Sequence, residues 1–153
     1  GEIMKPSFYH YTECGLSNIY LMNGYEISET PDGSAVSIKD IDGLHKAIGK
    51  FLTSLKKNLA GEEIRFIRLE MLMSQTMLAF LLGVSEQTLR RWENDKICIP
   101  KPSESLLRLL YREKVISQQS KISTILKEFA ALEEQMNNEV VFRETANGWR
   151  ASA

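Results

Sequence analysis

The segment from Ser74 to Glu93, SQTMLAFLLGVSEQTLRRWE, constrains the fold of this chain more than any other. Ser74 and Ser85 each stand where a hydroxyl can cap a helix, and Gly83 can adopt the positive φ that ends one. The residues expected to face inward are Leu78, Ala79, Leu82, Val84, Leu89 and Trp92. The pattern therefore predicts two short helices that cross steeply through a tight turn.

The outward face of the second predicted helix carries side chains that can bind base edges and phosphates. These residues are Glu86, Gln87, Thr88, Arg90 and Arg91. Arginine can bind guanine O6 and N7, glutamine can pair with adenine, and glutamate can accept from cytosine N4. The chain has a net charge of −1, so any affinity for DNA has to come from local charge.

Residues 61–115 resemble the Xre/Cro family of helix-turn-helix regulators, the phage-repressor type. The matching positions are Ser74-Gln75, Leu78-Ala79, Gly83-Val84-Ser85, Leu89 and Trp92-Glu93, with Ile64, Ile67 and Arg68 before them and Pro102 to Leu110 after them. Helices are predicted near residues 62–72, 74–82, 85–94 and 103–115. The resemblance implies a central lambda-repressor-like bundle.

The resemblance also implies a role for individual residues. Gln75 and Thr88 look like phosphate contacts, and Lys96 resembles the phosphate-contacting loop that follows the second helix. Glu86, Gln87 and Arg91 look like base readers, with Arg90 as a helper. Arg68 and Glu93 resemble the ion pair that ties the first helix of the family to the end of the recognition helix.

Two departures from the family pattern concern apolar residues. Leu72 stands where the family often has glycine, which predicts a tighter or more apolar first turn. Phe66, Leu69 and Phe80 are large apolar residues at positions that often face solvent. We expect them to pack against the flanking regions and to make the domain part of one integrated body.

The regions on both sides are predicted to be partly β-structured, so the expected fold class is mainly α with small β hairpins at both ends. Residues 1–60 should form a hairpin around Asn23-Gly24, a second turn at Pro31-Asp32-Gly33, and an amphipathic helix from Asp40 to about Leu59. Its apolar positions are Ile41, Leu44, Ile48, Phe51 and Leu55. Residues 116–153 should form a long helix over 117–137 and a β-rich tail with a hairpin at Asn147-Gly148.

The amino-terminal segment YHYTECGLSNIYLMN, residues 9–23, is similar to proteins related to the MqsA-type antitoxins. In those proteins a zinc-binding module with paired cysteines precedes a helix-turn-helix domain. Cys14 and Cys98 are the two cysteines of this chain, and they lie far apart in the sequence, so the chain lacks the closely spaced cysteine pairs of that module. Cys14, His10 and His45 make a poor zinc set, so we predict no metal site and no cofactor. The amino-terminal aromatic residues could form a toxin-binding surface or a small core under the first long helix.

Together these patterns predict a sequence-specific regulator that binds double-stranded DNA in the major groove. A homodimer on a pseudo-palindromic site is expected, with the dimer surface in residues 122–136, at the end of the 103–115 helix, or in either hairpin. The alternative is an antitoxin that binds a toxin partner and also autoregulates. We find no catalytic motif and no apolar run of about 20 residues, and therefore expect neither an enzyme nor a membrane protein. The two cysteines are interpreted as reduced thiols, which favours a cytoplasmic location.

Overall fold

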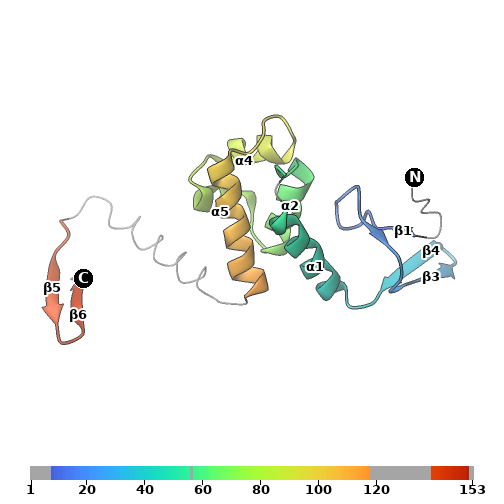
Figure 1. Ribbon diagram of the computed structural model, residues 1–153, viewed down its shortest axis with the longest axis horizontal. Helices are drawn as coiled ribbons and strands as arrows, with labels where there is room; N and C mark the ends of the chain where they lie inside the picture. Colours follow the sequence, from blue (N-terminus) through green and yellow to red (C-terminus); the bar gives the residue numbers. More distant parts are fainter. Residues whose placement is uncertain (1–7, 56, 118–138, 152–153) are drawn as a thin grey trace. The chain divides into compact units, whose positions relative to one another are not determined.

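The computed structural model of the chain describes residues 8–55, 57–117 and 139–151 (Figure 1). The chain divides into two compact units, residues 1–119 and residues 120–153, and each is described by itself. The apolar seam that we predicted from Ile122 to Met136 lies outside the described residues. None of the helices in the described part of the chain combines the length and the hydrophobicity of a membrane-spanning helix.

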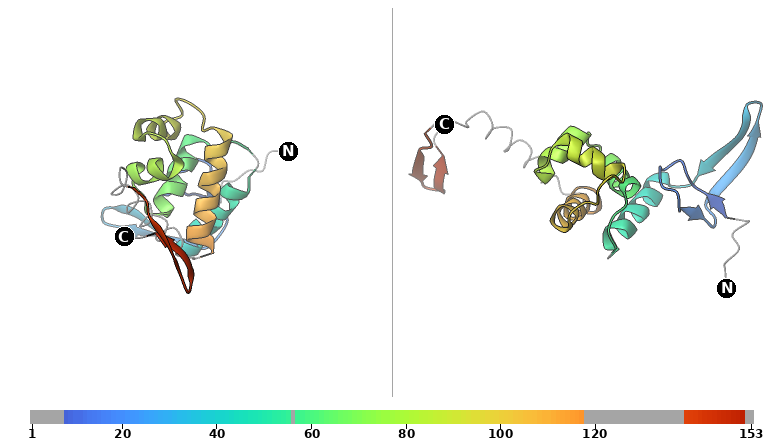
Figure 2. Two further views of the ribbon diagram at one scale, coloured as in Figure 1. Left: turned by 90° about the vertical axis from the view of Figure 1, so that its left-hand side faces the viewer. Right: turned by 90° about the horizontal axis from the view of Figure 1, so that it is seen from above.

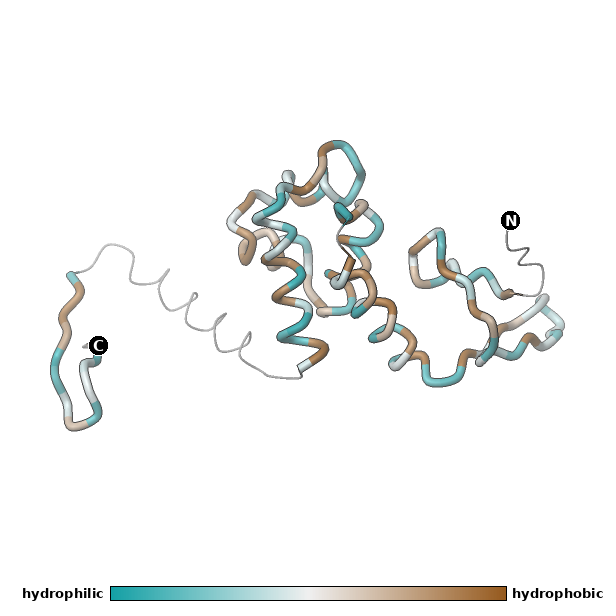
Figure 3. Tube along the Cα trace, viewed as in Figure 1, coloured by the Kyte–Doolittle hydropathy of each residue, from teal (hydrophilic) through white to brown (hydrophobic). Residues whose placement is uncertain are grey.

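The helical part of the first unit follows the prediction closely. Its elements are α1 (Ile41–Ser54), α2 (Gly61–Glu70), α3 (Gln75–Leu82), α4 (Glu86–Glu93) and α5 (Lys101–Tyr111), which continues into a π-helical segment, η1 (Arg112–Ile116). The four predicted helices between residues 62 and 115 are confirmed, with ends that differ by no more than two residues when η1 is counted with α5. Hydrophobic and hydrophilic positions recur in turn along these helices (Figure 3).

The helix ends have the local causes that the sequence predicts. Ser74 Oγ accepts from the backbone N–H of Met77 at 3.1 Å, and Ser85 Oγ accepts from that of Thr88 at 3.1 Å. Gly83 ends α3 with φ at 69°. Each cap satisfies a backbone group that the helix itself leaves unpaired, so α3 and α4 begin and end at defined residues.

The core lies among α1, α2, α3, α4 and α5. Its most deeply buried side chains include Ile64, Ile67, Met71, Leu78, Leu89, Leu107 and Tyr111. Figure 1 and both views of Figure 2 show α5 running beside α1. A five-helix body of this kind positions α3 and α4 through their apolar faces and leaves their other faces open to solvent.

Part of the predicted apolar face of α1 does not enter the core. Ile48 and Leu52 are buried, whereas Ile41 is 46% exposed and Phe51 is 60% exposed. The helix ends at Ser54 instead of continuing to Leu59, because Leu55 adopts an extended conformation, and residues 57–60 are not helical. The face that packs is therefore set by the direction in which α2 and α5 approach.

The three large apolar residues that depart from the family pattern differ in how deeply they are buried. Phe66 is buried, and its ring lies against His45 of α1 with centroids 5.5 Å apart. Leu69 is 49% exposed and Phe80 is 45% exposed, so these two side chains are only partly covered. Of the three, Phe66 thus contacts the flanking helix α1.

The amino-terminal strands pair differently from the prediction. Strands β1 (Tyr9–His10) and β2 (Tyr20–Leu21) pair with each other, and β3 (Tyr25–Thr30) pairs with β4 (Gly33–Ile38) across Pro31-Asp32. The predicted hairpin around Asn23-Gly24 is therefore wrong, and Gly24, with φ at 80°, joins two separate ribbons. Strands β3 and β4 form six residue pairs. A hairpin around Asn23-Gly24 would have paired β3 with the short strand β2, which has two residues.

In the second unit the described residues contain one hairpin. Strand β5 (Phe142–Thr145) pairs with β6 (Gly148–Ala151), which confirms the hairpin predicted at Asn147-Gly148. Thr145 Oγ1 donates to the carbonyl of Gly148 at 2.7 Å, and Thr30 Oγ1 makes the same bond to Gly33 at 2.5 Å in the other hairpin. The sequences TPDG and TANG thus close the two ribbons with the same local contact.

Candidate nucleic-acid interface

Helices α3 and α4 pack against each other across the Gly83-Val84-Ser85 turn and present one face of α4 to solvent. Leu89 and Trp92 hold α4 in the core, with 0% and 3% exposure. Gln87, Arg90 and Arg91 lie on the exposed face. Among the described residues, Gln87 and Arg91 have no side-chain hydrogen bond or ion pair, so their polar groups are available to a ligand.

Glu86, the first residue of α4, has partners on both helices. Thr76 Oγ1 of α3 donates to Glu86 Oε2 at 2.9 Å, and Arg90 Nη1 lies 3.4 Å from Glu86 Oε1. The structure thus joins two predicted site residues to Thr76, which the sequence reasoning missed. The only signal in the sequence is a hydroxyl in the first turn of α3, and that feature is too common to single out.

Thr88 has a more local position than its predicted role suggests. Its hydroxyl lies 2.9 Å from that of Ser85, and its backbone N–H donates to Ser85 Oγ at 3.1 Å. The two hydroxyls therefore stand together at the N-terminus of α4. This end of a helix carries the partial positive charge of unpaired backbone N–H groups, which favours anionic ligands.

A buried ion pair ties α2 to the end of α4. Arg68 Nε and Nη2 donate to the two carboxylate oxygens of Glu93 at 2.7 and 3.0 Å. Arg68 Nη1 also donates to the carbonyl of Met73 at 3.1 Å. The amide of Gln75 donates to Glu93 Oε1 at 3.1 Å, so this predicted phosphate contact belongs to the ion-pair network in the structure described. Bidentate geometry and burial make the network a rigid support for the exposed face.

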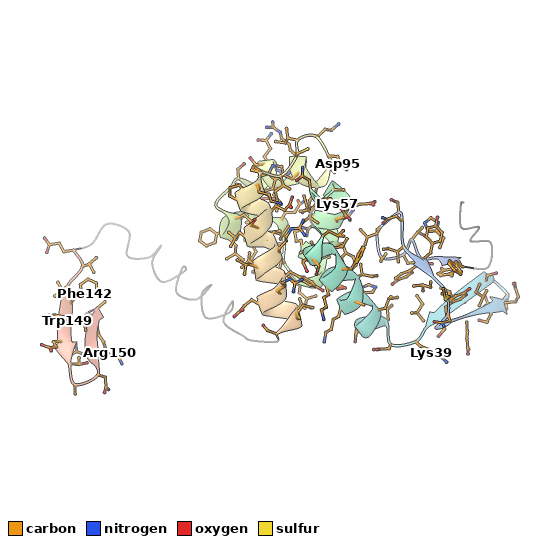
Figure 4. All side chains as sticks on the ribbon, viewed as in Figure 1. Lys39, Lys57, Asp95, Phe142, Trp149 and Arg150 are labelled. Atoms are coloured by element: carbon orange, nitrogen blue, oxygen red, sulfur yellow. The ribbon has the colours of Figure 1, made fainter. Side chains whose placement is uncertain are left out.

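The loop after α4 is held by a residue that the sequence reasoning passed over. Asp95 adopts φ of 56°, and its Oδ1 accepts from the backbone N–H of Gly61 at 2.8 Å. Ala60 offers α2 no side-chain cap, so Asp95 supplies the acceptor from across the fold (Figure 4). Lys96 follows on the exposed side, and its backbone N–H donates to Arg91 at 2.9 Å.

The amino-terminal segment packs on the helices through a chain of three polar side chains. Tyr11 Oη lies 2.7 Å from His45 Nε2, and His45 Nδ1 lies 2.6 Å from Glu70 Oε1. Tyr11 is 3% exposed. Of the two uses foreseen for the amino-terminal aromatic residues, Tyr11 thus has the core position, whereas Tyr20 is 41% exposed.

The segment that follows Tyr11 borders the candidate interface. Ser17 Oγ donates to Glu62 Oε1 at 2.8 Å and holds the segment on α2. A groove of about 810 Å³ lies between residues 13–15 and helices α2, α3 and α4. Thr76 and Glu86 line this groove, so its mouth reaches the first residues of the candidate interface.

Cys14, His10 and His45, the poor zinc set of the sequence, have other contacts. Cys14 Sγ donates to the carbonyl of Tyr11 at 3.3 Å, and burial raises the pKa of its thiol. His10 Nε2 lies 2.7 Å from the carbonyl of Ser17. Within the described ranges no three His, Cys, Asp or Glu side chains are grouped as metal ligands.

Comparison with known protein families places residues 64–110 in a known class of domain. The sequence model of the family described as helix-turn-helix matches these residues, which are just under a third of the chain. Residues 64–110 therefore contain a helix-turn-helix domain, a class of domain that is typical of DNA-binding regulators, and α3 and α4 are its two helices. Comparison of the chain with curated proteins and with solved structures gives no match.

Proposed function

We propose that this chain is a sequence-specific transcription regulator that binds double-stranded DNA through α4. The observation that carries the proposal is the division of α4 into two faces. Leu89, Trp92 and Glu93 are buried, and Gln87, Arg90 and Arg91 are exposed on the opposite side. A rigid helix with a polar outward face fits the major groove of DNA, where glutamine and arginine can bind base edges.

Each predicted site residue discussed here has a role in this proposal. Gln87 and Arg91 read bases, with Arg90 beside them, and Lys96 contacts the phosphate backbone. Gln75 reaches a phosphate from the edge of the buried network, where its amide now binds Glu93. Thr88 contacts the backbone from the N-terminus of α4, where the helix dipole favours a phosphate.

We further propose that the protein acts as a homodimeric autorepressor on a pseudo-palindromic site. Domains of this kind read short half-sites, and two copies bind half-sites about 10 base pairs apart or multiples of that. The charge of residues 61–115 supports a need for two copies, because nine basic residues are opposed by eight acidic ones. A single copy would gain little from non-specific attraction to the phosphates.

The test is binding of the full chain to duplex DNA from upstream of its own gene and to a scrambled duplex of the same length, over a series of salt concentrations. We expect tighter binding to the upstream DNA, and loss of that preference when Arg90 and Arg91 are both replaced by alanine. A matched control removes two other exposed arginines, Arg143 and Arg150, which lie directly across from each other on β5 and β6. Equal affinity for both duplexes would contradict the proposal.

A toxin-binding antitoxin is the second candidate, and the amino-terminal ribbon favours it. Tyr25 pairs with Ile38 and Ile27 pairs with Val36, so these four apolar residues share one face of β3 and β4. Ile27 is 58% exposed, which offers apolar surface to a protein partner. Co-expression with the product of the neighbouring gene, scored by growth, distinguishes the candidates when Ile27→Ser is compared with Ser28→Ala on the other face.

A further inference from the structure

The first turns of α3 and α4 share a hydrogen-bonded chain of three side chains. It begins at the Thr76 hydroxyl of α3, passes through the Glu86 carboxylate, and ends at the Arg90 guanidinium one turn along α4. The two contacts measure 2.9 Å and 3.4 Å, and each uses a different carboxylate oxygen. The carboxylate is thus held from both sides before any ligand is bound.

The helices do not depend on this chain for their packing. Leu78, Ala79 and Leu89 bury the contact between α3 and α4, and Ser74 and Ser85 cap the two helices. The Glu86 and Arg90 side chains are 41% and 51% exposed. An exposed ion pair or hydrogen bond contributes little to folding stability, because water competes for the same groups. The hydrogen bonds among Thr76, Glu86 and Arg90 therefore contribute little to the stability of the free protein.

The setting changes when the face of α4 meets DNA. Water leaves the contact, the effective dielectric constant falls, and a hydrogen bond between fixed groups becomes stronger. A carboxylate that approaches the groove also needs a fixed orientation, since an unpaired negative charge near phosphates is repelled. Thr76 and Arg90 together supply the orientation, and Arg90 supplies part of the compensating charge.

We propose that Thr76 is a positioning residue for DNA recognition, which sets the base preference of this protein by fixing Glu86 and, through it, Arg90. The inference rests on the proposed function, because it requires that α4 reads DNA. It differs from that function in assigning part of the specificity to α3. Thr76 itself touches no base in this proposal.

The test uses the full chain and a random duplex library of about 30 base pairs, from which the wild-type protein selects its preferred site. Dissociation constants are then measured for that site and for its scrambled counterpart. The variants are Thr76→Val, which keeps the shape of the side chain and removes the hydroxyl, Thr76→Ser, which keeps the hydroxyl, Glu86→Gln, and the double variant of Thr76→Val with Glu86→Gln. Thr30→Val in the β3–β4 hairpin is the matched control.

We expect Thr76→Val to reduce the ratio of scrambled to selected dissociation constants by about threefold to tenfold, the effect of one hydrogen bond. Thr76→Ser should keep the ratio, and the melting temperature should stay unchanged in both. In the double variant the ratio should fall no further than in Glu86→Gln alone, because both changes break the same set of hydrogen bonds.

Three results would overturn the positioning role. They are an unchanged ratio for Thr76→Val, a double variant whose loss is the product of the two single losses, and a lowered melting temperature that accounts for the weaker binding. A wild-type protein that selects no site overturns the proposed function together with this inference. A wild-type protein that selects a site, with Thr76→Val unaffected, leaves the proposed function intact and removes only the role of Thr76.

Discussion

Gly61 lies so close to Glu93 that a Cβ atom on Gly61 would stand 2.3 Å from the carbonyl oxygen of Glu93. The start of α2 therefore rests directly on the end of α4. The backbone N–H of Gly61 also donates to Asp95, which follows in the next loop. Glycine is needed here for the close approach of two backbones, and the orientation of the candidate recognition helix depends on it.

Replacement of Gly61 by alanine should lower the free energy of unfolding by about 1–3 kcal/mol, because backbone has to move to admit the methyl group. Urea denaturation measures the change. Gly43→Ala is the comparison, since it also lies in the first turn of a helix, but the atoms nearest to its added Cβ belong to the side chain of Asp40, the cap of α1, which can rotate at the expense of that cap. A smaller loss in Gly61→Ala than in Gly43→Ala would contradict the close contact.

Removal of the hydroxyl from two buried tyrosines, Tyr111 and Tyr11, should change the stability of the protein in opposite directions. The Tyr111 hydroxyl has no hydrogen-bond partner among the described residues, and burial, with a smaller effect of Glu70, raises its pKa to about 12. Tyr111→Phe should therefore stabilise the protein by about 1 kcal/mol, because an unsatisfied buried group is removed. Tyr11→Phe should destabilise it by about 1 kcal/mol, because Tyr11 binds His45 at 2.7 Å.

Thermal and urea unfolding of the two tyrosine variants at pH 7 measure these changes side by side. Both substitutions remove one oxygen from a buried ring, so each serves as the control for the other. A loss of stability in Tyr111→Phe as large as that in Tyr11→Phe would mean that the Tyr111 hydroxyl has a partner in solution.

Leu72 is an exposed residue in a conformation that suits glycine. Its φ is 57° and it is 88% exposed, so its side chain contributes little packing to offset the strain. Leu72→Gly should raise the free energy of unfolding by up to about 1 kcal/mol, after the greater freedom of glycine in the unfolded chain is deducted. Leu69→Gly, in the helix just before, should lower it by about 1 kcal/mol. Chemical denaturation that ranks the two variants the other way would contradict this account.

Glu104 predicts a dependence of stability on pH. Burial by itself raises the pKa of this carboxyl, but the hydrogen bonds from Arg108 and from the backbone of Leu59, with the charges of Arg108 and Lys101, outweigh it and leave the pKa below 4.5. A carboxyl with a lowered pKa in the folded state stabilises the fold above its unfolded pKa, and this contribution is lost as the pH falls through the folded value.

Glu104→Gln should therefore be much less stable than the wild type at pH 7, and the difference should shrink as the pH falls below 4.5. Unfolding free energies of both proteins between pH 7 and pH 3 measure it. Glu26→Gln on the exposed β3–β4 ribbon is the control for an ordinary surface carboxyl. A difference that stays constant over this range would show that Glu104 does not stabilise the fold as a charged group.

The helices of the candidate site could be predicted because their causes lie within a few residues of each other. The caps at Ser74 and Ser85, the turn at Gly83 and the apolar spacing of α4 are all local, and the observed boundaries follow them. The strands at the amino terminus were predicted less well. The turn residues Asn23-Gly24 allow a hairpin, but the partner of a strand depends on every other strand that is available to it.

The sequence by itself determined which face of α4 is polar and where α3 and α4 begin and end, since these features depend on backbone preferences and on periodicity along one helix. Only the tertiary structure decided that Thr76 binds Glu86, that Gln75 binds Glu93 and that Asp95 caps α2. Glu86 follows Thr76 by ten residues, Glu93 follows Gln75 by 18, and Asp95 follows Gly61 by 34. Hydrogen bonds over such separations form only where the packing of the whole core brings two helices or loops together. A local sequence pattern therefore does not predict them.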